Sequence, residues 1–227
     1  MRRLDSRKSA LFALAAFGYV GAGPAFAGQL EVTVLDHLGQ PVPEIAVYAE
    51  VNGGPMPSPQ NGLERASVTM NQRDLAFSPH ILIVTTGTAV TFPNDDDVRH
   101  HVYSFSPTKQ LNLTIDSGDT HEPRTFDVPG IVTLGCNIHD DMLAYVVVVD
   151  TPHFAKSDEN GRAILDGLAP GQYRLNLWTP RAAPKNLPGP LDFTVGEGQT
   201  IAIEHRFENK LFPPHRHSET SLHWAHY

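Results

Sequence analysis

The hydrophobic pattern of this chain is one of short alternating runs separated by turn residues. Residues 29–35, QLEVTVL, alternate with a period of two, which is typical of a strand with one buried face. Residues 145–150, YVVVVD, form a continuous apolar run and predict a strand buried on both faces. The same reasoning predicts further strands at residues 42–51, 66–70, 81–84, 89–92, 102–105, 111–115, 131–134, 162–165, 172–178, 191–195 and 200–206.

Turn-forming residues separate these runs, and no amphipathic helical pattern follows the first 27 residues. The 19 prolines and 18 glycines are spread along the chain, and residues 53–62, GGPMPSPQNG, predict a long loop or linker. This distribution predicts an all-β protein. About 200 residues can bury one large core or two small ones.

The first 27 residues have the organisation of a secretory signal. Arg2, Arg3, Arg7 and Lys8 precede an apolar run over residues 10–20, and Ala25-Phe26-Ala27 has the A-x-A form of a cleavage site. A membrane anchor is the alternative, but the run is short for a span and ends in Gly and Pro. We expect residues 1–27 to be removed and the mature protein to be periplasmic or secreted, without membrane insertion.

The charge of the mature chain excludes some partners. Without the four basic residues and one acidic residue of the signal, the net charge of −8 becomes −11. Such a charge argues against binding to nucleic acid or anionic lipid and favours a basic protein partner.

Two segments on either side of the centre resemble parts of one small module. VTVLDHLGQPVPEIAVYAE and KSDENGRAILDGLAPGQYRLNLW are similar to the opening and closing strands of the transthyretin-like, carboxypeptidase regulatory-like sandwich. We therefore expect residues 28–58 and 152–207 to form one accessory module around the central stretch; two consecutive β-units are the alternative. Residues 208–227 are expected to be a disordered tail whose histidines, His215, His217, His223 and His226, form no defined site.

The central stretch contains an unusual group of metal-binding side chains in GCNIHDDM, residues 135–142. Cys136 is the only cysteine of the chain, so it forms no internal disulfide; His139 follows at +3 and Met142 at +6. Thiolate, thioether and imidazole suit copper, and a blue-copper site adds a second histidine. Zinc bound by cysteine and histidines is an alternative, as are an inert buried cysteine and a core methionine. A c-type haem is excluded because C-x-x-C-H is absent.

Residues 63–150 resemble the plastocyanin and amicyanin group of cupredoxins. The similarity lies in AFSPHILIVTTGTAVTFPND, in HHVY, and in FDVPGIVTLGCNIHDDM with its short C-x-x-H-x-x-M loop. It implies an eight-stranded sandwich and one type 1 copper ion bound by His100, Cys136, His139 and Met142. Because adjacent residues of a strand face opposite sides, His100 and His101 are alternatives for the upstream ligand, and we prefer His100.

The resemblance implies an electron carrier rather than an enzyme, and no catalytic triad or phosphate-binding loop is evident. The expected partner is a redox protein such as a cytochrome or a dehydrogenase, which Asp140 and Asp141 would steer if it were basic. A copper-delivery protein and a non-redox binding module with a vestigial metal site are the alternative functions.

Overall fold

A computed structural model of the chain describes residues 27–53, 68–139 and 141–215. These residues form strands joined by loops, with one 3-10 turn, η1 (Pro184–Asn186), as the only helical element among them. The predicted all-β fold is confirmed. Within the same ranges, no helix is long and apolar enough to cross a membrane. All but the last residue of the expected signal at residues 1–27 and the greater part of the loop at 53–62 lie outside the described residues.

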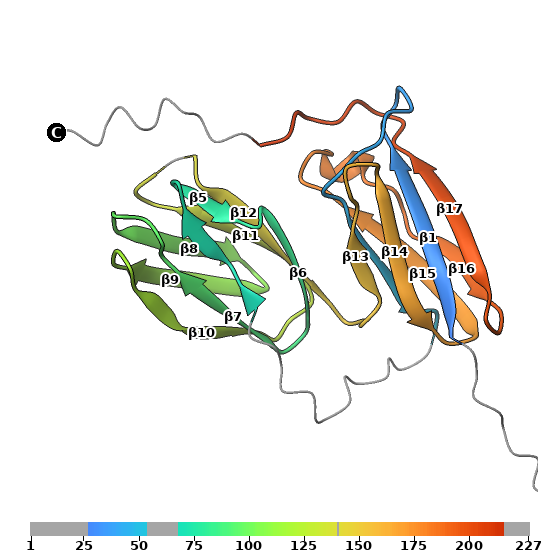
Figure 1. Cartoon of the computed structure of the whole chain (residues 1–227), viewed down its shortest axis with the longest axis horizontal. Coiled ribbons are helices and arrows are strands. Elements are labelled where there is room, and N and C mark those ends of the chain that lie inside the picture. The colour runs from blue at the N-terminus through green and yellow to red at the C-terminus, as the bar shows by residue number, and fades with distance from the viewer. Residues whose placement is uncertain (1–26, 54–67, 140, 216–227) are drawn as a thin grey trace, which may run out of the picture.

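The strands form two β-sandwiches that lie side by side (Figure 1). The first, here called the flanking sandwich, is built from both ends of the chain. One sheet has the order β14 (Arg162–Leu168), β1 (Gly28–Leu35), β17 (Thr200–Arg206); the other has the order β13 (Phe154–Lys156), β2 (Ala46–Val51), β15 (Gly171–Trp178), β16 (Leu191–Val195).

The second sandwich, here called the central sandwich, contains the strands between β2 and β13. A three-stranded sheet has the order β10 (Thr120–Phe126), β7 (Thr88–Pro93), β3 (Val68–Thr69). A five-stranded sheet has the order β6 (Ile81–Thr85), β12 (Leu143–Val149), β11 (Gly130–Cys136), β8 (His100–Ser106), β9 (Lys109–Ile115). A hairpin of β4 (Asn71–Arg73) and β5 (Ala76–Ser78) packs beside them. The two sheets hold eight strands, the number that the cupredoxin resemblance implies.

Each sandwich has its own hydrophobic core, and a third cluster joins them. Strand β12 contributes to both faces of its sheet: Val146 and Val148 lie in the core of the central sandwich, whereas Val147 and Val149 pack toward the flanking sandwich. This third cluster, here called the junction cluster, also includes Trp178 of β15. The centroid of the Trp178 ring lies 5.2 Å from that of Tyr145, and the two rings meet edge-on. The prediction that residues 145–150 form a strand buried on both faces is confirmed over Val146–Val149, which are at most 2% exposed.

Some sequence-based strand limits are wrong. The strand expected at residues 42–51 begins only at Ala46, because Pro43 has no amide hydrogen to donate and Glu44 has a φ of 62°. Strand β10, THEPRTF, was not expected, since it is polar and contains a proline; it lies at the edge of its sheet, where such a sequence is tolerated.

Residues 208–215, assigned from the sequence to a disordered tail, follow a defined path in the structure. Leu211 is 7% exposed and belongs to the core of the flanking sandwich. The chain then crosses to the central sandwich, where His215 Nε2 contacts the carbonyl oxygen of Asp141 at 2.7 Å. His217, His223 and His226 lie outside the described residues.

Candidate metal centre

Two neighbouring strands and one tight loop bring the candidate ligands together. Strands β8 and β11 are adjacent and antiparallel, and Cys136 at the end of β11 pairs with Val102 of β8. The loop after Cys136 folds back at once, because the Met142 amide donates to the His139 carbonyl at 3.1 Å and the Cys136 amide donates to the Met142 carbonyl at 3.3 Å. His100 at the start of β8 therefore lies beside a loop that is 36 residues later in the chain.

Three of the four predicted ligand side chains lie close together. Cys136 Sγ is 3.7 Å from Nδ1 of His100 and 3.8 Å from Nδ1 of His139, and one ligand atom from each of the three residues lies within 4.8 Å of the others. It is the one group of three or more His, Cys, Asp or Glu side chains in the described ranges that could hold a metal ion.

The spacing of these donors fits a small metal ion. Metal–sulfur and metal–nitrogen bonds of about 2.3 and 2.1 Å that meet at about 120° separate sulfur from nitrogen by about 3.8 Å. The two observed distances, 3.7 and 3.8 Å, match this value. Both sulfur–nitrogen distances therefore agree with a trigonal His₂Cys set, which is the set that type 1 copper prefers.

The structure places His100, and not His101, beside Cys136. His100 is fully buried, with its Nδ1 toward the sulfur. His101 faces the other side of the sheet, where its Nε2 bonds to Asn112 Oδ1 and its ring lies near Tyr103. The alternation of side chains along a strand explains this opposition.

Met142 follows the loop and is 1% exposed. Its side chain belongs to the core of the central sandwich together with Cys136, and its backbone closes the loop through both of its polar groups. These contacts hold the residue in place beside the cluster; its role as a ligand belongs to the proposal below. Of the two acidic residues expected at the mouth of the site, Asp141 is partly buried and Asp140 lies outside the described residues.

Asp96 also contacts the cluster, and the sequence did not predict this contact. Its Oδ2 lies 2.8 Å from Nε2 of His100, so the carboxylate orients the ring whose other nitrogen faces the sulfur. The same carboxylate accepts hydrogen bonds from the amides of Asp74, at 2.6 Å, and Leu75, at 3.0 Å, in the turn between β4 and β5. The available signal was an aspartate four residues before the histidine, but three adjacent aspartates, residues 95–97, made the choice ambiguous.

The cluster is prepared electrostatically to bind a cation. Burial raises the pKa of the Cys136 thiol, but hydrogen bonding to His100 and to the backbone at His101 and Ile138 outweighs it and lowers the pKa to about 6. Burial lowers the pKa of His100, but the contacts with Cys136 and Asp96 outweigh it and raise that pKa. These contacts favour the thiolate of Cys136, which is the form that binds metals.

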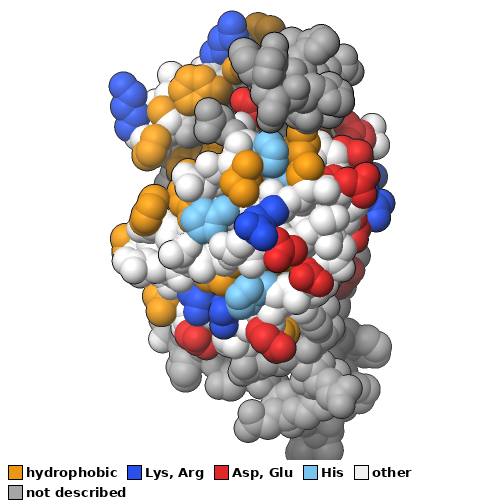
Figure 2. All heavy atoms as spheres, turned by 90° about the vertical axis from the view of Figure 1, so that its left-hand side faces the viewer, with side chains coloured by type: hydrophobic (Ala, Val, Ile, Leu, Met, Phe, Trp, Pro, Cys, Tyr) orange, Lys and Arg blue, Asp and Glu red, His pale blue; other side chains and the backbone are white. Residues whose placement is uncertain are grey.

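One edge of the cluster reaches the surface. Cys136 is 3% exposed and His100 is fully buried, whereas His139 is partly exposed beside Ile138, which is 50% exposed. The end of the central sandwich that lies away from the flanking sandwich carries charged side chains of both signs among histidines and hydrophobic groups (Figure 2).

Comparisons with known proteins found similar solved structures. A purple cupredoxin from Nitrosopumilus maritimus is 24% identical, over 37% of this chain and 100% of its own, with a TM-score of 0.33. A variant of amicyanin in its reduced Cu(I) form is 19% identical, over 45% and 99% of the two chains, with a TM-score of 0.34.

A copper-containing nitrite reductase from Thermus scotoductus SA-01 is 21% identical, over 51% of this chain and 28% of its own, with a TM-score of 0.36. No protein-family model and no protein with a curated description matches the sequence. Each of these TM-scores is below 0.5, so the function has to be inferred from the residues of the chain itself.

Proposed function

We propose that this chain is an exported type 1 copper protein that carries electrons between redox partners and is not itself an enzyme. The observation that carries the proposal is the buried group of His100, Cys136 and His139, with donor atoms at the spacing of a trigonal copper site. Met142 at the end of the same loop is the fourth residue that would hold the ion. Copper bound by these residues would supply one-electron chemistry between Cu(I) and Cu(II).

The residues of the site support electron transfer in three ways. The paired strands and the hydrogen-bonded loop fix the positions of the donors, so little rearrangement should accompany a change of oxidation state. Burial of Cys136 and His100 excludes water from two sides of the cluster. His139 reaches the surface and is the proposed route by which electrons enter and leave.

Export and partners rest on the sequence. The signal-like segment, residues 1–27, supports a periplasmic or secreted location. The negative charge of the mature chain supports a basic redox partner such as a cytochrome or a dehydrogenase.

The test is visible and EPR spectroscopy of the copper-loaded protein beside its Cys136→Ser variant. We expect an intense blue or green Cu(II) form that the variant lacks, because the colour depends on the copper–thiolate bond. A colourless Cu(II) form with an unperturbed EPR spectrum would refute the proposal.

Copper delivery without electron transfer is a second candidate, favoured by the partial exposure of His139, where an acceptor could take over a ligand position. Voltammetry and a transfer assay separate the two functions. A reversible potential with slow loss of Cu(I) to a chelator supports the electron carrier, and rapid transfer without a reversible potential supports delivery.

A further inference from the structure

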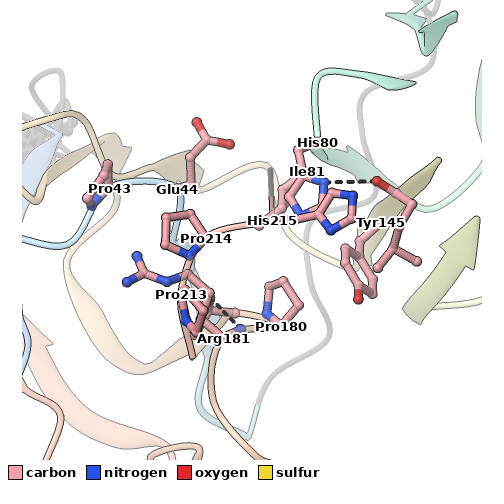
Figure 3. A pocket seen from close by; sticks show the side chains of 12 residues that line it. Pro43, Glu44, His80, Ile81, Tyr145, Pro180, Arg181, Pro213, Pro214 and His215 are labelled. Carbon is pink, nitrogen blue, oxygen red and sulfur yellow. Dashed lines mark hydrogen bonds between the residues drawn. The ribbon is translucent and has the colours of Figure 1, made fainter. Parts of the chain in front are cut away.

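A cavity of about 390 Å³ lies where the two sandwiches meet (Figure 3). Its walls come from three separate parts of the chain: the flanking sandwich contributes Glu44 and Arg181, the central sandwich contributes His80 and Tyr145, and the segment after β17 contributes His215. The cavity is separate from the metal cluster, since it contains none of the three clustered residues.

Arg181 is the only lysine or arginine among the described residues that line this cavity. Its Nε donates to the carbonyl oxygen of Phe212 at 2.9 Å, which orients the guanidinium. Among the described residues, no carboxylate lies within 4.0 Å of it. Burial lowers the pKa of Arg181, and the more distant Asp36 opposes that shift. A partly buried guanidinium without a close counter-ion favours an anionic ligand.

The other acidic and apolar groups of the cavity narrow the class of ligand. Glu44 is already paired, since its Oε1 lies 2.8 Å from Nζ of Lys156, so it does not require a cationic ligand. A multiply charged anion would nevertheless be repelled by that nearby carboxylate. The remaining wall is largely apolar and includes Ile81, the ring of Tyr145 and several prolines.

We propose that the junction cavity binds a small monocarboxylate with an apolar body. The carboxylate pairs with the guanidinium of Arg181, and the apolar body lies against the prolines and the ring of Tyr145. Proline rings hold their backbone rigidly, so this wall is formed before the ligand arrives. Binding does not require copper and is independent of the function proposed above.

Two histidines that line the cavity form hydrogen bonds with the backbone beside the candidate metal loop. His80 Nδ1 contacts the carbonyl oxygen of Leu143 at 2.9 Å, and His215 Nε2 contacts that of Asp141 at 2.7 Å. The two imidazole rings stack: their centroids are 5.3 Å apart, and the angle between the ring planes is 9°. They hold the residues on both sides of Met142, so a ligand that displaces either ring should also move the loop.

The test is calorimetric titration of the metal-free full chain with benzoate, cyclohexanecarboxylate and hexanoate, with benzamide as the uncharged match for benzoate. We expect benzoate to bind about tenfold more tightly than benzamide, because a charge-assisted pair replaces a neutral contact. Arg181→Gln should remove this difference and leave benzamide binding unchanged. Arg174→Gln, which removes an exposed arginine of β15 that does not line the cavity, should retain it.

Three outcomes would overturn the proposal. The first is failure of all three carboxylates to bind at millimolar concentration, and the second is equal affinity for benzoate and benzamide in the unaltered protein; neither depends on whether Arg181→Gln folds. The third is binding at another surface, which NMR detects. Amide shifts should concentrate around Met142, Tyr145 and Arg181, and shifts confined to other surfaces contradict a junction site.

Discussion

Replacing Asp96 with asparagine tests whether this carboxylate holds the metal cluster in place. The side chain of Asp96 is 11% exposed, pairs with Nε2 of His100 at 2.8 Å and accepts two backbone amides of the β4–β5 turn. Asparagine keeps the shape but replaces one acceptor oxygen with a donor. At least one hydrogen bond of the charged acceptor is lost, so the free energy of unfolding should fall by about 2–3 kcal/mol.

The same change should weaken copper binding. A carboxylate that supports a metal-binding histidine contributes about 10- to 100-fold to affinity, because it fixes the orientation of the ring and increases its basicity. Competition with a Cu(I) chelator measures this loss, and urea unfolding of the metal-free protein measures the stability. The reduction potential should rise, since removing a negative charge near the site disfavours Cu(II).

Asp97→Asn is the matched control, because Asp97 is the exposed neighbour of Asp96 in the sequence. It should change affinity by less than about twofold and stability by less than about 0.5 kcal/mol. If Asp96→Asn binds copper as tightly as the unaltered protein, Asp96 does not support His100 and the account of the site is wrong.

Three further predictions test the site and the junction. Ultraviolet titration of the metal-free protein should show the Cys136 thiolate forming near pH 6, and His100→Gln should raise the midpoint of this titration. Copper affinity should fall as the pH drops through the same midpoint, because protons compete with copper for the sulfur. His101→Ala should leave the copper spectrum unchanged, whereas His100→Gln should abolish it, and the opposite result would reverse the ligand choice. Val147→Ala, at the junction, should lower the free energy of unfolding by about 2 kcal/mol, whereas the exposed Thr133→Ala should change it by less than about 0.5 kcal/mol.

The strand pattern was predictable where burial alternates or is continuous. Strand β1 alternates buried and partly buried positions over its whole length, and β12 is apolar because both of its faces are covered. Strand β10 was missed because an edge strand with Pro123 carries little hydrophobic signal. The start of β2 was misplaced because Glu44 adopts a positive φ, which a glutamate in the sequence does not predict.

The sequence alone indicated the local part of the candidate metal site. Cys136, His139 and Met142 follow one another at intervals of three residues, and backbone hydrogen bonds among them close the short loop that they share. Only the tertiary structure decided that His100 faces the sulfur, that Asp96 supports its ring, and that Arg181 lines a cavity with His80. These contacts join residues that are distant in the sequence, or residues such as His100 and Asp96 that adjoin a residue of the same type. Packing of the strands, rather than local spacing, brings them together.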